Sequence, residues 1–189
     1  MANASPPLRA LMSATMGSKS SCDREQTVTS APSAANCSAT FRPIPLDPPV
    51  TAVDVLAATD AVVPVVEVVD SRIEGWELTA GSAIADNALA ARVVHGDAIG
   101  DPSGVDLSLE GVVVRRNGER VATGVGADVL GSPARVVAWL ADALADRDER
   151  LTAGDLISTG SLTELIPFEP GDTVEARFAS LGSVTVARE

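Results

Sequence analysis

The spacing of apolar positions predicts its first clear elements between positions 50 and 70 of the chain. Thr51 and Asp54 have the spacing of a capping box at the start of a short helix, which we expect to run to about Asp60. Residues 62–69 are dense in valine, and β-branched density of this kind predicts a largely buried strand with Pro64 at its start.

Two further segments have equally distinct patterns. Residues 106–124 carry alternating apolar positions around Asn117 and the glycine after it, which predicts a β-hairpin that turns at this pair. Ser132, followed by proline, marks the start of a helix whose apolar positions recur at helical spacing, and the charged residues 146–150 close it.

The remaining segments are short. Residues 84–91 fit either a short helix or a loop, and strand-like runs cover residues 92–95, 156–158, 173–178 and 183–187. Together these segments predict one α+β domain that is rich in strand. Residues 1–45 are rich in Ser, Ala, Thr and Pro without a sustained period, so we expect a disordered tail there and the domain over residues 46–189.

Composition and charge narrow the classes of function. The net charge of -12 repels phosphate backbones and Lys and Arg form no basic cluster, which argues against nucleic acid as a partner. No apolar run is long enough for a membrane-spanning helix or a secretory signal, which predicts a cytoplasmic protein. Cys22 and Cys37 are too few for a disulfide framework, and we expect Trp76 and Trp139 to be packing residues.

Glu67 is the first candidate for chemistry, because a carboxylate in an apolar strand is costly unless a cation or an Arg satisfies it. Two interpretations stay open. Glu67 and Arg72 form an ordinary structural pair at the strand end, or Glu67 binds a divalent cation with Asp70 and Arg72 nearby.

Four other positions are candidates for chemistry, and each also has an ordinary structural interpretation. Asp86 fits a turn or helix cap, or a polar group directed into a pocket. Gly160 and Ser161 fit an ordinary loop, or a loop that offers N–H groups and a hydroxyl to an anion. His95, the sole histidine, is expected at the surface or satisfied rather than as a catalytic base.

Several motifs recur together in an order that resembles one enzyme family. They are Val66-Glu67-Val68-Val69-Asp70-Ser71-Arg72-Ile73, Ile84-Ala85-Asp86-Asn87, Asn117-Gly118-Glu119, Gly124 to Gly126, Val129-Leu130-Gly131-Ser132-Pro133, Val137-Ala138-Trp139-Leu140, Leu151-Thr152-Ala153-Gly154-Asp155 and Ser158-Thr159-Gly160-Ser161-Leu162. Over about residues 50–188 the chain resembles the 2-keto-4-pentenoate hydratase and 4-oxalocrotonate decarboxylase branch of the fumarylacetoacetate hydrolase superfamily.

The resemblance implies an α+β fold like the C-terminal domain of fumarylacetoacetase, with mixed, strongly curved β-sheets and flanking helices. It also implies a pocket for Mg2+ or Mn2+, where the cation binds the carboxylate and keto oxygens of an α-keto acid and stabilises its enolate. Carried over by motif, Glu67 resembles the last of three carboxylate ligands of the metal. Gly160, Ser161 and Leu162 resemble the wall that holds the carboxylate of the substrate.

The same resemblance implies roles for three further residues. Asp86 is the candidate catalytic group of the pocket. Asp70 and Arg72 are expected to support the metal ligand from behind, without touching the cation.

The sequence departs from the family pattern before residue 46. The family has a Glu-x-Glu pair, which supplies the other two metal ligands, about thirty residues before the position of Glu67. This chain has Asn36-Cys37-Ser38 there, and Lys19 is the only lysine of that region. We therefore expect an N-terminally incomplete domain whose first part is missing or replaced.

The resulting prediction is a divalent-metal-dependent hydratase, a lyase, acting on an unsaturated 2-oxo acid such as 2-keto-4-pentenoate in aromatic-compound catabolism. Three alternatives stay open: a 4-oxalocrotonate-type decarboxylase, an acylpyruvate-type hydrolase, and a non-catalytic fragment or subunit of such an enzyme. The expected partners are the small 2-oxo acid and either further copies of this chain or a homologous subunit.

Overall fold

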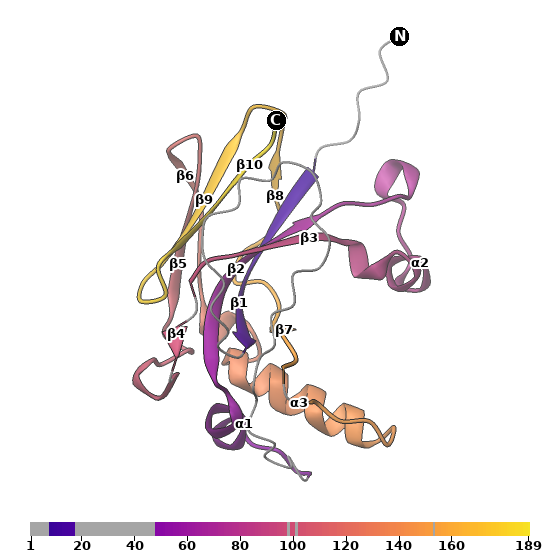
Figure 1. Ribbon diagram of the computed structural model, residues 1–189. Helices are drawn as coiled ribbons and strands as arrows, with labels where there is room; N and C mark the ends of the chain where they lie inside the picture. Colours follow the sequence, from indigo (N-terminus) through magenta and orange to yellow (C-terminus); the bar gives the residue numbers. More distant parts are fainter. Residues whose placement is uncertain (1–7, 18–47, 98, 101, 153) are drawn as a thin grey trace.

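The valine-rich segment forms strand β2 (Ala61–Val69), an inner strand of the larger of two sheets (Figure 1). The structure is a computed structural model that describes residues 8–17, 48–97, 99–100, 102–152 and 154–189. Every residue of β2 is buried except Glu67, which is half-buried. Burial on both faces explains why the segment is a nearly continuous apolar run rather than an alternation.

The larger sheet is built around β2 by antiparallel pairing. On one side β2 pairs with β1 (Leu8–Gly17), and on the other with β3 (Ala90–His95) and with β4 (Ile99–Gly100). Strand β1 also pairs with two short strands, β7 (Ile157–Ser158) and β8 (Ile166–Phe168). The sheet therefore has the order β3-β2-β1-β7, with β4 beside β2 and β8 beside β1.

The smaller sheet has the order β10-β9-β5-β6 and is antiparallel throughout. Strands β5 (Gly111–Arg116) and β6 (Glu119–Val125) form the predicted hairpin, and Asn117 in its turn has a φ of 53°. Strands β9 (Thr173–Phe178) and β10 (Ser183–Ala187) cover the two segments predicted as strands near the C-terminus.

The helices among the described residues lie at the edges of the sheets (Figure 1). Helix α1 (Ala52–Ala58) begins at the predicted capping box, and α3 (Pro133–Ala145) begins after Ser132 as predicted. Helix α2 (Ala80–Ala85) overlaps only the first two residues of the segment 84–91 that was predicted as helix or loop. The 3-10 turns are η1 (Glu74–Trp76), η2 (Asn87–Leu89), η3 (Pro102–Gly104) and η4 (Gly126–Asp128). Among the residues that the structure describes, no helix has the length and apolar character needed to cross a membrane.

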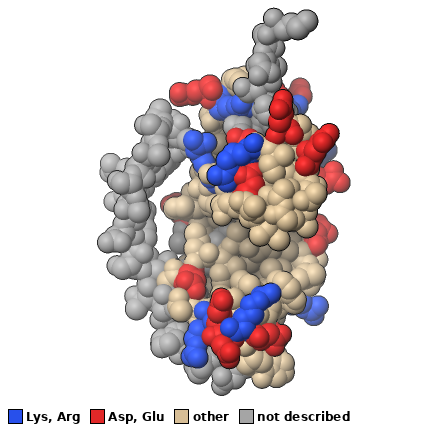
Figure 2. All heavy atoms as spheres, turned by 90° about the vertical axis from the view of Figure 1, so that its right-hand side faces the viewer, with Lys and Arg blue, Asp and Glu red and all other residues tan. Residues whose placement is uncertain are grey.

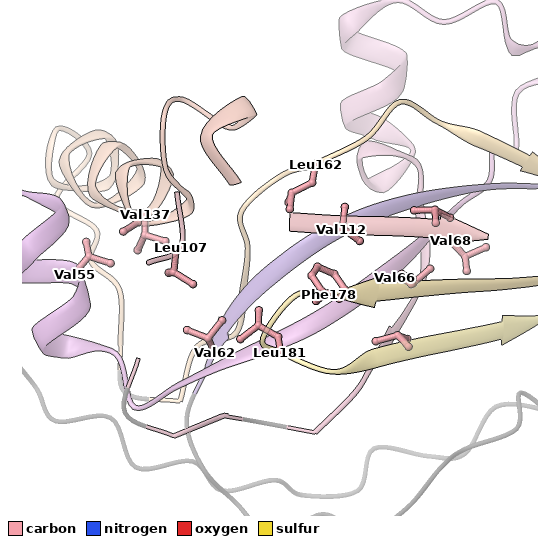
Figure 3. Packing of buried hydrophobic residues seen from close by; sticks show 14 of the residues in the cluster. Val55, Val62, Val66, Val68, Leu107, Val112, Val137, Leu162, Phe178 and Leu181 are labelled. Carbon is pink, nitrogen blue, oxygen red and sulfur yellow. The ribbon is translucent and has the colours of Figure 1, made fainter. Parts of the chain in front are cut away.

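The hydrophobic core connects the two sheets and the helices. Val62, Val66 and Val68 lie on one face of β2 and belong to a single cluster with side chains of the smaller sheet such as Phe178 (Figure 3). Helices α1 and α3 contact each other and add buried residues to the same cluster. Side chains alternate along a strand, so Glu67 lies on the face of β2 that is turned away from this cluster.

Strand β1 differs from the expectation that residues 1–45 form a disordered tail. Leu8–Gly17 is a strand that pairs with β2 from Arg9, opposite Val69, to Gly17, opposite Ala61. The signal is present in the sequence, because every even position from Leu8 to Met16 is apolar, which is the period of a strand. The rest of residues 1–45 lies outside the described residues.

Two smaller predictions were wrong. Pro64 lies inside β2 rather than at its start, opposite Ala14 of β1. On its other side it lies between the parts of β2 that pair with β3 and with β4, and its carbonyl accepts there from the Gly96 N–H at 2.9 Å. The N–H that proline lacks would point to this same side, where no residue of β3 or β4 is paired with Pro64. Trp139 is 63% exposed instead of packed, because the buried face of α3 carries Val137, Ala138 and Ala141.

A buried carboxylate holds the end of the smaller sheet together. Glu110, just before β5, is 4% exposed and accepts hydrogen bonds from the Ser180 N–H at 2.8 Å, the Ser180 hydroxyl at 2.5 Å and the Leu181 N–H at 3.3 Å. Ser180 and Leu181 lie in the turn between β9 and β10. These three donors satisfy the charge and fix the turn against β5.

We expect Glu110→Ala to lower the free energy of unfolding by about 3 kcal/mol, because it leaves buried donors without an acceptor. Urea denaturation followed by circular dichroism measures the change, with Glu119→Ala at an exposed position of the hairpin as the control. Equal unfolding midpoints for Glu110→Ala and Glu119→Ala would contradict this role of Glu110.

Candidate functional site

Glu67 is the one acidic residue of β2 and the starting point of the candidate site. Its carboxylate accepts a hydrogen bond from the Ser158 side chain of β7. Burial raises the pKa of the Glu67 carboxyl above its usual range, and the hydrogen bond from Ser158 offsets part of this rise. The site therefore begins with a carboxylate that is held in place and partly removed from water.

The segment after Ser158 is a loop, residues 159–162, with a well-defined conformation. Thr159 is 1% exposed and Leu162 is 3% exposed, so both ends of the loop are buried. Gly160 between them has a φ of 99°, a conformation that side chains strongly disfavour. The Ser161 hydroxyl donates to the Thr163 carbonyl at 2.6 Å and accepts from the Thr163 N–H at 3.3 Å.

The structure thus brings Glu67 close to the loop that the sequence motif singled out. Ser158 is the connecting residue, and it was not predicted as a site residue. The sequence offers only one signal for it, its place in the Ser-Thr-Gly-Ser run, because a lone serine at a strand end has no distinctive pattern.

A second polar group forms where β2 ends. Asp86, the C-cap of α2, is 7% exposed and accepts hydrogen bonds from the Arg72 backbone N–H at 2.9 Å and from Arg72 Nε, and the Ser71 hydroxyl lies 3.4 Å away. The Arg72 backbone N–H is the main cause that lowers the pKa of the Asp86 carboxyl, with further contributions from the Arg72 side chain and Ser71. Burial opposes the shift but does not reverse it.

Arg72 therefore pairs with Asp86 and not with Glu67, which corrects the expected structural pair at the strand end. The physical reason is the geometry of the chain after β2. Residues 70–72 leave the strand toward α2, where the Asp70 N–H donates to the Leu89 carbonyl at 3.0 Å and the Asp70 side chain accepts from the Ser71 N–H at 2.9 Å. The Arg72 side chain is 78% exposed, so Asp86 fixes it at Nε while most of its surface faces water.

The residues around Glu67 do not form a complete cation site by themselves. In the register of the larger sheet, Glu67 lies opposite Leu11 on β1 and opposite Val93 on β3, neither of which offers an oxygen ligand from its side chain. No group of three or more His, Cys, Asp or Glu residues that could hold a metal occurs among the described residues. The positions expected for the other two carboxylates, Asn36-Cys37-Ser38, lie outside these residues.

His95 is exposed at the end of β3, in agreement with its expected place at the surface. The face that contains α2 and α3 has its charged side chains in an upper and a lower group, with an uncharged, hollowed band between them (Figure 2). Strand β7, with Ser158, lies between α2 and α3 at the height of this band (Figure 1).

Comparison with known proteins agrees with this arrangement of motifs. Residues 50–187 match the family model described as fumarylacetoacetate (FAA) hydrolase C-terminal. The chain belongs to this family. The match covers both sheets from β2 onward and all the site residues named above. The expected α+β fold of this family is confirmed, while the expected mixed sheets are antiparallel in the described residues.

Several curated relatives of this chain are hydratases or decarboxylases by name. A 4-oxalocrotonate decarboxylase of Pseudomonas sp. (strain CF600) is 47% identical over 131 residues, covering 69% of this chain and 50% of that protein. A 2-keto-4-pentenoate hydratase of Paraburkholderia xenovorans (strain LB400) is 42% identical over 131 residues, covering 69% of this chain and 49% of that protein. The chain thus spans about half the length of these curated relatives.

A solved structure of a family member gives the same picture. The 4-oxalocrotonate decarboxylase from Pseudomonas putida G7, complexed with magnesium and adipate, superposes with a TM-score of 0.76 at 35% sequence identity. The superposition covers 97% of this chain and 61% of that one. The same enzyme has also been solved with calcium and acetate, so that protein accommodates a divalent cation together with a carboxylate compound.

The raised pKa of Glu67 predicts a pH-dependent stability. The folded chain binds the Glu67 proton more tightly than the unfolded chain does. Below the unfolded pKa, near 4.5, the side chain is protonated in both states and its charge costs no stability. As the pH rises through the folded pKa, the buried side chain becomes charged and the folded state loses stability. We therefore expect Glu67→Gln to raise the melting temperature at pH 7 and this gain to shrink as the pH falls toward 4.5.

Thermal unfolding followed by circular dichroism between pH 4.5 and 8 measures this effect. Glu74→Gln, at an exposed position beyond β2, is the matched control and should leave the melting temperature unchanged across the range. A gain for Glu67→Gln that is constant with pH would contradict the assignment of the effect to the buried charge.

Proposed function

We propose that this protein is a divalent-metal-dependent hydratase acting on an unsaturated 2-oxo acid such as 2-keto-4-pentenoate, in the breakdown of aromatic compounds. The observation that carries the proposal is the hydrogen bond between Glu67 and Ser158, which holds the carboxylate beside the loop of residues 159–162. Family membership and the names of the relatives support the same class of reaction.

The loop supplies the groups that suit the carboxylate end of such a substrate. Gly160 allows a close backbone approach because it has no side chain. The Ser161 hydroxyl donates its proton to the Thr163 carbonyl in this structure, so it would have to exchange that bond for one to the carboxylate when substrate binds. Leu162 is buried and closes the loop against the core. We propose that these three residues hold the carboxylate and that the uncharged hollow between α2 and α3 takes the hydrocarbon part of the substrate (Figure 2).

Asp86, Asp70 and Arg72 receive roles that follow from their contacts. We keep Asp86 as the candidate catalytic carboxyl. The hydrogen bonds that it accepts from Arg72 also give it a second role, which is to fix the Arg72 side chain just after β2. Asp70 caps the turn that follows the strand through Ser71. Together they hold the chain segment that leaves β2 just after Glu67.

We propose Mg2+ or Mn2+ as the cation, with Glu67 as the ligand that this chain offers. Oxygen ligands suit such hard cations. A single carboxylate among the described residues does not complete an octahedral shell, so the remaining donors have to come from beyond these residues. We therefore propose that the described residues bind and orient the substrate. We assign them no chemical step at the cation. A cytoplasmic location and association with further copies or with a homologous subunit stay predictions.

A second candidate is decarboxylation of 4-oxalocrotonate. It is favoured by the higher identity to a 4-oxalocrotonate decarboxylase, 47% against 42% for a 2-keto-4-pentenoate hydratase. Both substrates carry a carboxylate next to a keto group, so the same loop suits either one.

An assay panel with the full chain and either Mg2+ or Mn2+ tests the proposal. The substrate is 2-hydroxypent-2,4-dienoate, the conjugated enol form of 2-keto-4-pentenoate. We expect its absorbance to be lost as water adds, and the rate to fall more than about 100-fold in Glu67→Gln. Glu119→Gln, at an exposed position of the hairpin, should keep the full rate.

The other arms of the panel separate the alternatives. Release of carbon dioxide from 4-oxalocrotonate without hydration of the dienoate would favour the decarboxylase, and cleavage of an acylpyruvate would favour the hydrolase. No turnover of any of these substrates would overturn the proposal and favour a non-catalytic subunit.

A further inference from the structure

Gly124 of β6 lies in direct backbone contact with the loop of residues 159–162. A Cβ atom at this position would lie 1.7 Å from the Leu162 carbonyl oxygen and 2.7 Å from its carbonyl carbon. Atoms of real side chains do not approach a backbone so closely, and the obstacle is main chain that cannot rotate away. The contact between β6 and the loop therefore exists only because position 124 has no side chain.

The loop is fixed at its other end to a different sheet. Ser158, just before the loop, belongs to β7 of the larger sheet and bonds Glu67. Gly124 belongs to the smaller sheet. The loop thus spans the two sheets, and the contact at Leu162 determines how far it stands from the carboxylate at its beginning.

We propose that Gly124 is a positioning residue for the substrate-binding loop: by admitting the Leu162 carbonyl against β6, it sets the distance of Gly160 and Ser161 from Glu67. Gly124 itself touches no substrate and acts through the backbone of the loop. This role rests on the proposed function only where it refers to substrate.

Gly126, two residues further along the chain, provides a matched control. A Cβ there would lie 1.8 Å from the Leu107 carbonyl oxygen and 3.3 Å from Pro133 Cδ. The steric conflict is as severe as at Gly124, but it falls on the start of α3 and the segment before β5. Gly126→Ala therefore reports the cost of overcrowding without a direct effect on the loop.

The test measures amide hydrogen exchange and steady-state kinetics of the full-length chain for wild type, Gly124→Ala and Gly126→Ala. We expect amides of residues 160–163 to exchange about tenfold faster in Gly124→Ala relative to those of β9, and to keep their wild-type ratio in Gly126→Ala. With 2-hydroxypent-2,4-dienoate we expect KM to rise about tenfold in Gly124→Ala and kcat to stay within about twofold.

A merely structural effect gives a different result, because a smaller folded fraction lowers the apparent kcat and leaves KM unchanged. Equal loop exchange in both glycine variants, or an unchanged loop in Gly124→Ala, would overturn the positioning role. Absence of turnover in the wild type would refute the proposed function, while the exchange ratios would still decide the role of Gly124.

Exchange of the wild type in low urea keeps the test decisive even if Gly124→Ala does not fold. A loop held by β6 should open together with β6, as one cooperative unit. Opening of residues 160–163 at lower urea than β6 would overturn the proposal.

Discussion

The burial of β2 on both faces is the constraint on which the rest of the structure depends. One face, with Val62, Val66 and Val68, joins the two sheets into a single core, and the other face carries Glu67. A half-buried carboxylate raises the free energy of the folded chain unless hydrogen bonds offset the loss of water. Ser158 provides one such bond, and by doing so it ties β7 and the following loop to the middle of β2. The position of the candidate site thus follows from the need to satisfy one charge.

The end of β2 is controlled by a separate charge pair. Asp86 fixes both the backbone and the side chain of Arg72, so the chain leaves the strand in a defined direction toward α2. This anchor lies just beyond the end of β2, five positions after Glu67. The end of the strand between the two interactions has little freedom to move, and a rigid strand is the support that a precisely placed carboxylate requires.

Elements with strong local signals were predictable from the sequence. The capping box at Thr51, the Asn117 turn and the proline after Ser132 each act within a few residues, so their elements were confirmed nearly to the residue. Strand β1 was missed because its alternation is composed of Ala and Met among Ser and Thr, which suggested a tail. Two interactions could not be predicted from the sequence. The partner of Arg72 lies 14 residues away, and the bond between Glu67 and Ser158 joins residues 91 apart. A single sequence does not fix the strand register that brings such distant segments together.

Gly124 extends the same reasoning from one sheet to the other. The smaller sheet is held by its own interactions: its edge strand β6 pairs with β5, and the Glu110 carboxylate fixes the turn between β9 and β10. The loop contacts β6 at Leu162, and it is connected to Glu67 through Ser158. Because these contacts lie on different sheets, the loop keeps its conformation only while the distance between the two sheets stays the same. Any substitution that moves the sheets apart should therefore act on the site even when it lies far from Glu67. The shared valine core between the sheets, which fixes their spacing, is for this reason part of what shapes the site.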